Sequence, residues 1–374
     1  MRLCRAGQQI GCQPGVTVDK KLEGKRVLGV GIIGCGAISR MHIDAYLQIP
    51  GTKIVAVHSA HEDSARRVAE ELGVSWYTDL EALLKRKDLD LVSICTPSGV
   101  HAEAAIAAAR AGKHVVVEKP LDVTLEKIDA IIAACEENGV QLHCIFNNRF
   151  RGGNAFVKRA VDAGRFGKLF NVNAIVRWYR TPEYYQNSSW HGTRALDGGG
   201  ALMNQSIHYV DLLLWMGGQV QSVSAVTDTL LHRSIETEDT AAAVLRFQSG
   251  AIGTILATTS TYPGYPAELQ VAGERGSASI RDGVIQNWSF IDTDPLDREA
   301  ETYMEAHKDG DNRAADPMAM TCADHRRQME RAVASILTGG KPDVSGADAR
   351  RSVELILAIY EASASGRPVV LGGK

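Results

Sequence analysis

The sequence predicts an α/β protein in which a doubly wound parallel sheet is followed by a smaller α+β domain with a mainly antiparallel sheet. Three observations predict this class. Apolar strands alternate with helical segments over residues 26–148. A glycine-rich turn follows the first of these strands. Beyond residue 150, strand-like segments are joined by turns. Alternation of strand and helix produces right-handed crossovers and parallel pairing, whereas strand–turn–strand order produces antiparallel pairing.

Composition limits the classes of protein that the chain belongs to. Of its 374 residues, 45% are hydrophobic and 23% are charged, as in ordinary globular proteins of two domains. The net charge of −3 gives no electrostatic reason to expect nucleic acid or an anionic membrane as partner. No apolar run is long enough to cross a bilayer. The seven cysteines are scattered, without metal-binding spacing, so we expect reduced thiols in a cytoplasmic protein and no metal.

Residues 26–148 form the predicted nucleotide-binding domain, and residues 1–25, which lack an apolar stretch, are expected to be a flexible extension. The expected strands are 27–33, 53–57, 91–95, 115–118 and 141–145. The expected helices are 37–47, 62–72, 79–84, 102–110 and 125–137. Thr78 is the expected N-cap of the short helix 79–84.

Residues 149–374 form the second predicted domain, whose C-terminal helix is expected to pack back on the first. The expected strands are 169–179, 220–227, 240–247, 251–259, 268–272, 277–280 and 284–288. The expected helices are 155–163, 322–337 and 347–362, the last opening with a capping box from Ser345 to Asp348. The polar segment 292–317 is predicted to be an irregular surface loop or a partner contact.

The turn after the first strand, Gly-Cys-Gly-Ala-Ile-Ser, nearly matches the dinucleotide fingerprint. Gly34 permits the tight turn, and Gly36 lets the backbone approach a pyrophosphate. The pyrophosphate is then expected on the helix N-terminus, against Ala37 and Ile38. A purely structural turn is the alternative, and the strand–turn–helix context favours dinucleotide binding.

The end of the second strand bears on the choice between NAD and NADP. An acidic residue there would hold the adenosine ribose, but the chain has His-Ser-Ala-His at 58–61. Ser59 can bind a 2′-phosphate, and His61 or Arg66 can supply charge, which favours NADP. Alternatively, Glu62 or Asp63 binds the ribose from one turn later.

Two further turns are expected at the C-terminal edge of the sheet, where open α/β folds bind ligands. After the third strand, Thr96, Pro97 and Ser98 should lie against the ribose and phosphates of the cofactor. His101 either starts the next helix or contacts the ligand.

The fourth strand ends on Glu118 and Lys119 and is stopped by Pro120, which cannot donate to a ladder. We expect both charged residues to contact the cofactor. The alternative for Lys119 is a surface lysine at a strand end.

In the second domain, three glycines at 198–200 lead into a helix expected to run to about Met216. Asn204, His208 and Asp211 are spaced at i, i+4 and i+7, so they are predicted to share one helix face. The alternative for His208 is a core histidine satisfied by Asp211.

An aromatic-rich segment precedes this helix. We predict that Tyr179, Tyr185, Trp190 and Arg194 contact a sugar, because aromatic faces beside hydrogen-bonding groups suit a sugar ring. A solvent-facing or subunit-facing patch is the alternative.

Together these motifs resemble the Gfo/Idh/MocA oxidoreductases, the glucose–fructose oxidoreductase and inositol dehydrogenase family. The resemblance covers residues 25–374 and rests on the segments 34–39, 95–98, 118–120 and 198–211. It implies a Rossmann domain followed by a substrate-binding and oligomerisation domain with an open-faced sheet. It also implies NAD(P), a carbohydrate substrate and a homodimer or homotetramer.

The resemblance assigns catalytic roles residue by residue. Lys119 matches the active-site lysine, and His208 matches the histidine assigned as acid/base. Many relatives have Asp where this chain has Asn204, so a carboxylate is missing. Segment 204–208 is similar to that of enzymes acting on sugars at C3, including nucleotide-sugar 3-dehydrogenases.

The resulting hypothesis is a dehydrogenase that moves a hydride between a secondary hydroxyl of a sugar, glycoside, polyol or nucleotide sugar and the nicotinamide. His208 would accept the proton and Lys119 would anchor the developing charge. Asn204 and Asn148 would orient the substrate, and Arg149 would line the same cavity. Two alternatives stay open: a redox-neutral enzyme with recycled NAD, and a non-catalytic nucleotide or sugar sensor.

Overall fold

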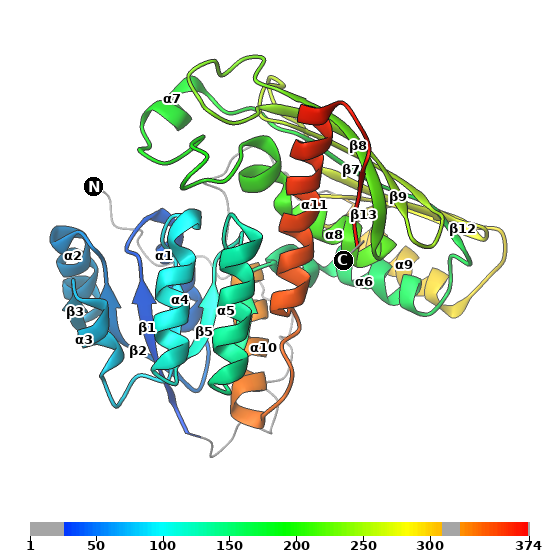
Figure 1. Cartoon of the computed structure of the whole chain (residues 1–374). Helices are drawn as coiled ribbons and strands as arrows, with labels where there is room; N and C mark the ends of the chain where they lie inside the picture. Colours follow the sequence, from blue (N-terminus) through cyan, green and yellow to red (C-terminus); the bar gives the residue numbers. More distant parts are fainter. Residues whose placement is uncertain (1–25, 309–321, 373–374) are drawn as a thin grey trace.

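The computed structural model describes residues 26–308 and 322–372, and it contains two sheets with helix α11 (Gly346–Ser365) between them (Figure 1). The predicted extension 1–25 lies outside the described residues. No helix in the described ranges combines the length and the apolar character needed to cross a membrane.

The first domain is a parallel sheet of six strands in the order β3-β2-β1-β4-β5-β6, which confirms the predicted doubly wound fold. Its strands are β1 (Leu28–Ile33), β2 (Thr52–His58), β3 (Ser75–Tyr77), β4 (Leu91–Ile94), β5 (His114–Val117) and β6 (Leu142–Cys144). Its helices are α1 (Ala37–Tyr46), α2 (Glu62–Leu72), α3 (Leu80–Leu84), α4 (His101–Arg110) and α5 (Leu125–Glu137). The strand order reverses between β1 and β4, and open sheets bind their ligands at such a switch point.

Two local expectations in this domain were wrong. The edge strand β3 was not predicted, because three residues are too few for a periodic pattern. The N-cap of α3 is Asp79, whose side chain accepts a hydrogen bond from the Glu81 N–H, and Thr78 lies one residue too early. Aspartate is the stronger cap, since its ionised oxygen also complements the helix dipole.

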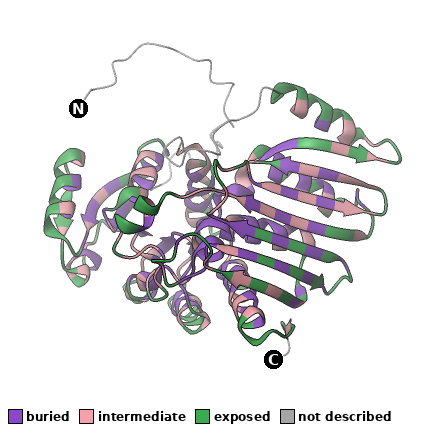
Figure 2. Ribbon diagram, turned by 90° about the horizontal axis from the view of Figure 1, so that it is seen from above, coloured by how far each residue is buried: buried purple, intermediate pink, exposed green. Residues whose placement is uncertain are grey.

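The second domain contains a sheet of eight strands in the order β13-β12-β11-β7-β10-β9-β8-β14. Within the described ranges, β7 and β10 form its one parallel pair, so the prediction of a mainly antiparallel sheet is confirmed. The strands are β7 (Leu169–Arg177), β8 (Val220–Asp228), β9 (Thr240–Phe247), β10 (Ile252–Thr258), β11 (Glu268–Gly273), β12 (Gly276–Arg281), β13 (Val284–Phe290) and β14 (Val369–Val370). Along them, buried and exposed residues alternate, leaving one face open (Figure 2).

The other face of this sheet packs against α11 and three further helices, α6 (Gly152–Asp162), α8 (Ile207–Gly217) and α9 (Pro295–Ala306). Helix α10 (Ala323–Thr338) packs on α1 of the first domain, and α7 (Pro182–Gln186) lies in the segment between β7 and α8. The short turns are η2 (Ser98–Val100), η3 (Asn147–Phe150) and η4 (Ala201–Ser206). The expectation of an irregular segment 292–317 was wrong for α9, which has a capping box between Asp294 and Asp297. Burial of Ala300 against the domain stabilises this helix. Residues 309–317 lie outside the described ranges.

The core is continuous across the two domains. Apolar side chains of α4, α5, α8 and α11 form one cluster that extends from the Rossmann sheet to the second sheet. On the opposite face of the Rossmann sheet, Met329 and Val333 of α10 pack with Ile43 of α1. The capping box predicted at Ser345 opens α11, and both of its hydrogen bonds are present. This shared packing holds the C-terminal edge of the Rossmann sheet against the second domain.

Candidate active site

The glycine turn between β1 and α1 is shaped for close approach by a ligand. Gly34 has φ of +94°, and a Cβ there would lie 2.7 Å from the carbonyl carbon of Cys95. A Cβ on Gly36 would meet no atom within 4 Å, and no side chain caps α1. The first N–H groups of α1, at Ala37 and Ile38, are thus left for an anion such as the pyrophosphate of a dinucleotide.

The turn after β4 lies beside the glycine turn. The hydroxyl oxygen of Thr96 is buried and has no partner within the described part of the chain, so it can bind a ligand atom. Ser98, which follows Pro97, is buried at the start of η2. His101 is fully buried, and its ring nitrogens lie 2.8 and 2.9 Å from the carbonyl oxygens of Pro120 and Thr96. His101 therefore ties two loops together and begins α4, as one of the two alternatives proposed, and its contact with the cofactor stays a prediction.

The end of β2 carries hydroxyl and cationic groups. Ser59 is buried and its hydroxyl oxygen accepts a hydrogen bond from the His61 N–H, while the His61 side chain is exposed before α2. Arg66 forms an ion pair with Asp63. The neighbouring Arg67 is close enough to Cys35 of the glycine turn for its charge to act on that thiol, whose pKa burial raises to about 11. Sequence reasoning missed Arg67, because only the fold brings α2 beside the turn.

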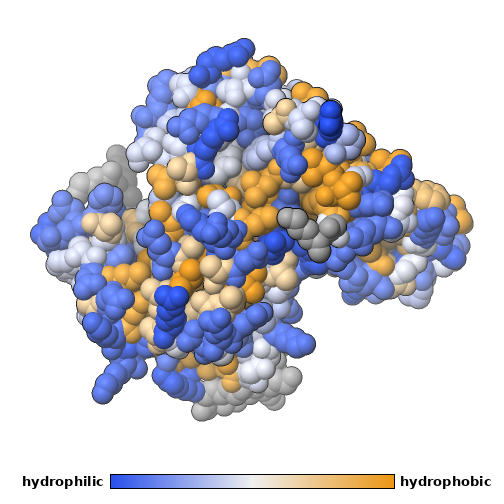
Figure 3. Space-filling view, viewed as in Figure 1, coloured by the Kyte–Doolittle hydropathy of each residue, from blue (hydrophilic) through white to orange (hydrophobic). Residues whose placement is uncertain are grey.

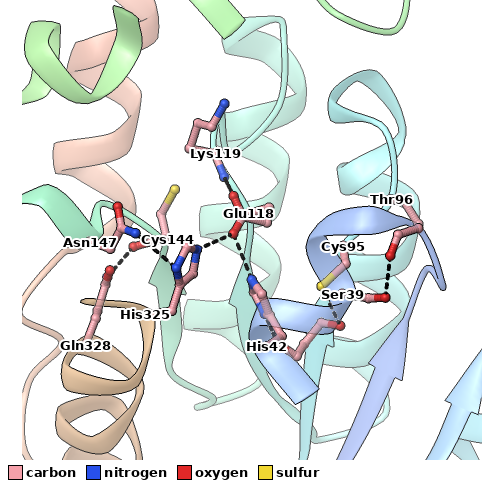
Figure 4. A network of polar contacts seen from close by, with 12 residues as sticks. Ser39, His42, Cys95, Thr96, Glu118, Lys119, Cys144, Asn147, His325 and Gln328 are labelled. Atoms are coloured by element: carbon pink, nitrogen blue, oxygen red, sulfur yellow. Dashed lines mark hydrogen bonds and ion pairs between the residues drawn. The ribbon is translucent and has the colours of Figure 1, made fainter. Parts of the chain in front are cut away.

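Lys119 links the two domains and is not a surface lysine. It follows β5, precedes a cis peptide bond to Pro120, and extends toward the second domain, away from the Glu118 carboxylate (Figure 4). Its Nζ donates to the main-chain oxygen of Asn204 at 2.7 Å and lies 3.5 Å from Asn204 Oδ1. Burial lowers the pKa of Lys119, although the carboxylates of Glu118 and Asp197 oppose this shift. A lysine whose pKa is lowered in this way can anchor negative charge and gives up its proton more readily than an exposed lysine.

The Glu118 carboxylate belongs to a buried hydrogen-bond network, and a contact between Glu118 and the cofactor stays a prediction. Its Oε1 lies 2.7 Å from His42 Nε2 and 3.3 Å from His325 Nε2, and its Oε2 accepts from the Lys119 N–H (Figure 4). Burial opposes ionisation, but the hydrogen bonds from His325 and His42 hold the pKa of Glu118 well below its usual value. The network joins α1, β5 and α10 directly beneath Lys119, and these distances are those of hydrogen bonds.

Two side chains of the glycine-led helix face the site. Between residues 201 and 210, Asn204 and His208 are the two positions that are not buried. His208 Nδ1 has no hydrogen-bond partner among the described residues, and its ring packs edge-on against Phe146 at 5.8 Å. Burial, followed by the positive charge of Lys119, holds the pKa of His208 well below its usual value. His208 is therefore neutral at pH 7 and able to accept a proton.

Asp211 does not share the face of Asn204 and His208, contrary to the prediction. It is buried and accepts two hydrogen bonds from Arg149, of 2.7 and 2.6 Å, in an ion pair between α8 and η3. Residues 201–206 form a π-helical turn, which has more residues per turn than the 3.6 assumed from the sequence. The expectation that Arg149 lines the substrate cavity was also wrong, because its guanidinium packs over Trp215 in the core.

Two polar residues that sequence reasoning missed, Asp197 and Arg180, complete the site. Asp197 accepts a hydrogen bond of 2.6 Å from the Asn204 side-chain N–H. Arg180 donates to Gln205 Oε1 at 2.7 Å, and its charge helps to lower the pKa of Lys119. The aspartate preceding the three glycines was a visible signal, but nothing in the sequence connected it with Asn204.

The residues predicted to contact the sugar differ in their exposure, since some are buried and others are exposed. Tyr185 was wrongly expected at the substrate, because it is buried and its hydroxyl lies 3.0 Å from Thr259 Oγ1. Tyr179 and Trp190 are partly exposed, and Arg194 is exposed and hydrogen-bonded to Glu236. Asn148 is buried at η3, where its main-chain oxygen accepts from Asn154.

Known proteins resemble the chain along most of its length. Residues 28–146 match an oxidoreductase family with an NAD-binding Rossmann fold, and residues 155–279 match the GFO/IDH/MocA C-terminal domain. The WlbA dehydrogenase of Bordetella pertussis, solved with NADH and UDP-GlcNAcA, is 33% identical with a TM-score of 0.84, over 93% of this chain and 99% of that one. WlbA of Chromobacterium violaceum, solved with the same two ligands, is 30% identical with a TM-score of 0.85, over 94% and 98% of the two chains. Myo-inositol 2-dehydrogenase of Thermotoga maritima is 28% identical over 87% of this chain and 93% of its own.

A Rossmann glycine turn beside a lysine and a neutral histidine defines an NAD(P)-dependent dehydrogenase acting on CH–OH groups. The chain belongs to the Gfo/Idh/MocA family of oxidoreductases.

Proposed function

We propose that the protein oxidises a secondary hydroxyl of a negatively charged sugar, with a nucleotide sugar as the substrate and C3 as the carbon oxidised. The observation that carries the proposal is the convergence of Lys119, His208 and Asn204 at the C-terminal edge of β5. This edge also carries the glycine turn, so a bound substrate and a bound nicotinamide would meet there.

The residues divide the chemistry between a proton and a hydride. Neutral His208 takes the hydroxyl proton, and cationic Lys119 stabilises the negative charge that develops on the oxygen. NAD(P) accepts the hydride that leaves the carbon. Asn204 and Asn148 orient the sugar, with Tyr179, Trp190 and Arg194 as further contacts.

Positive charge near the site supports an anionic substrate. Burial is the main cause that lowers the pKa of His191. The positive charges of Lys119 and Arg180 lower this pKa further, so the three side chains lie close together. Arg180 also packs over the rings of Trp178 and Tyr184, at 5.3 and 5.5 Å. Such a cationic, aromatic wall suits a carboxylate or a diphosphate attached to a sugar. Two structurally similar dehydrogenases were solved with UDP-GlcNAcA, a ligand with both groups.

The cofactor proposed is NADP in preference to NAD. Ser59, His61 and Arg67 surround the end of β2, and Arg67 lies toward the glycine turn. A 2′-phosphate would gain charge-assisted hydrogen bonds from such groups.

We also propose a cytoplasmic homodimer or homotetramer formed through the open sheet face. On that face, the exposed Val226 lies in one cross-strand row with Ala242, Leu256 and Ile175, and the exposed Val244 adjoins it. Hydrophobic atoms gather on the surface near β8 and α11 (Figure 3). A second copy of the chain, which offers the same apolar row, would cover this surface. The five cysteines among the described residues are free thiols, as expected in the cytoplasm.

A substrate panel tests the function. Nucleotide sugars with and without a carboxylate, free uronic acids, neutral sugars and inositols are assayed at the nicotinamide absorbance, with NAD and NADP separately. We expect the charged nucleotide sugars to give the highest kcat/KM. Preference for neutral polyols would contradict the anionic substrate, and a cofactor that copurifies without net reduction would favour the redox-neutral enzyme. Binding of sugar without turnover of any compound would favour the sensor.

A further inference from the structure

The Asp197 carboxylate is linked to Lys119 through one intervening residue, Asn204. Asp197 is almost fully buried, and its Oδ2 accepts a hydrogen bond of 2.7 Å from the Gly192 N–H. Its Oδ1 accepts from Asn204 Nδ2 at 2.6 Å. Asn204 in turn presents its main-chain oxygen and Oδ1 to Lys119 Nζ, at 2.7 and 3.5 Å. The chain of contacts therefore runs from carboxylate to amide to ammonium.

We propose that Asp197 is a positioning residue for the reaction, whose carboxylate orients Lys119 through the Asn204 amide and keeps it cationic. The proposal rests on the proposed function, because it gives Lys119 the role of binding the developing negative charge. A hydrogen bond to Asp197 fixes which end of the Asn204 amide faces Lys119. The carboxylate then compensates the cation without competing with the substrate for direct contact.

The groups packed around Asp197 show which cation its charge acts on. Five titratable groups among the described residues interact electrostatically with Asp197. They are Lys119 after β5, Glu238 before β9, Tyr184 and Tyr185 of α7, and Tyr360 of α11. Lys119 is the single cation in this set of described residues. Glu238 is committed elsewhere, since its oxygens accept from the N–H groups of Gly200 and Leu202.

Lys119 has its own set of charged and titratable neighbours. They are Glu118, Asp197, Cys144, Arg180, His191 and His208. Arg180 lowers the pKa of Lys119, while Glu118 and Asp197 raise it. Glu118 has the larger effect of these two carboxylates and is bonded to two histidines, whereas Asp197 is the carboxylate that reaches Lys119 through Asn204.

The ionisation of Asp197 matches the pH range in which Lys119 needs a counter-charge. Burial raises the pKa of Asp197 to about 7, although the Gly192 hydrogen bond and Lys119 act in the other direction. Asp197 is thus ionised in the alkaline range, where Lys119, with its lowered pKa, loses its proton. Removing the Asp197 charge lowers the pKa of Lys119 further, so the alkaline limb of the rate profile moves to lower pH.

The chain offers a charge-conserving swap as a matched variant. Asp197→Asn removes the counter-charge. The new amide accepts from the Gly192 N–H but then points its own N–H group at the N–H group of Asn204, unless the Asn204 amide turns over. In the double variant Asp197→Asn with Asn204→Asp, the new Asn accepts from Gly192 and donates to the new Asp. The carboxylate then faces Lys119 directly, and every hydrogen bond is retained.

The test measures the titration of Lys119 without any substrate. The wild-type protein, the single variant and the swap are labelled with acetic anhydride over a range of pH, and the acetylated Lys119 peptide is quantified by mass spectrometry. We expect the Lys119 pKa to fall by about one unit in Asp197→Asn and to return to the wild-type value or above it in the swap. The alkaline limb of kcat, measured on the substrate found in the panel, should move with it.

An unchanged Lys119 titration in Asp197→Asn, with the fold intact, would overturn the proposal. If that variant does not fold, the swap decides, because a Lys119 pKa below the wild-type value there would overturn it as well. A structural role alone would lower the Tm without moving the Lys119 titration. If the wild-type protein oxidised no sugar, the proposed function would fail while the labelling result would still stand.

Discussion

Lys119 Nζ donates a 2.7 Å hydrogen bond to the main-chain oxygen of Asn204, which joins the end of β5 to the π-helical turn of the second domain. The lysine comes from the nucleotide-binding domain, and its partner comes from the domain proposed to bind the sugar. The contact therefore places one cation where cofactor and substrate would meet. The opening of α8 places His208, the proposed proton acceptor, on the same face as Asn204.

Replacement of Lys119 by Met should abolish turnover and spare cofactor binding. Methionine keeps the length and apolar volume of the side chain but removes the charge, so we expect kcat to fall by about a thousandfold. Nicotinamide fluorescence titration should give a Kd close to that of the wild-type protein. Lys87→Met, on the exposed loop before β4, is the control and should leave kcat unchanged. Sugar oxidation at the wild-type rate in Lys119→Met would refute the mechanism.

Arg67→Gln should weaken NADP binding and leave NAD binding nearly unchanged. A charge-assisted hydrogen bond to the 2′-phosphate would be lost, which we expect to raise the Kd for NADP about tenfold. The matched control is Arg66→Gln, because Arg66 is held by Asp63 on the exposed surface of α2. Equal effects of Arg67→Gln on both cofactors would show that this arginine acts on the shared pyrophosphate instead.

Arg149→Met tests the assignment of Arg149 to the core. The substitution leaves Asp211 buried without its partner, so the free energy of unfolding should fall by about 3–5 kcal/mol in urea denaturation. Adding Asp211→Leu should recover part of that loss, since the uncompensated charge is then removed. For the folded fraction, KM should stay close to that of the wild-type protein. A large rise in KM without loss of stability would return Arg149 to the substrate cavity.

Val244→Glu tests the open face of the second sheet. Val244 is exposed in the middle of β9, beside the apolar row, and a buried carboxylate without a partner would oppose association. Light scattering coupled to size exclusion should show a smaller assembly than for the wild-type protein. Ile291→Glu, which follows β13 and lies outside that row, should leave the mass unchanged. A wild-type protein that is monomeric at micromolar concentration would disprove the proposed assembly.

Local sequence was a reliable guide wherever the deciding interaction is itself local. The apolar run of β1, the glycine turn after it and the capping box at Ser345 each depend on residues that are only a few positions apart in the sequence. The predicted positions of Lys119 and His208 depended on the same reasoning, together with the rule that parallel strands bind ligands at their carboxyl ends.

Predictions that assumed regular geometry or solvent exposure were less reliable. Asp211 was placed on the face of Asn204 by a period of 3.6 residues, but the turn that contains Asn204 is π-helical, and the Asp211 side chain meets Arg149. Tyr185 and Arg149 were judged by residue type, and the fold buries both. Nothing in the sequence indicated that two histidines, from α1 and α10, bind the Glu118 carboxylate.

By itself, the sequence determined the two-domain α/β architecture, the glycine turn and the placement of a lysine at a strand end, because periodicity and backbone sterics act over short stretches of chain. Only the tertiary structure decided which polar groups share the site with Lys119. Asp197 reaches it through Asn204, and Arg180 approaches from the end of β7. Such contacts join residues that are far apart in the chain, and packing alone determines which of them come within hydrogen-bond distance.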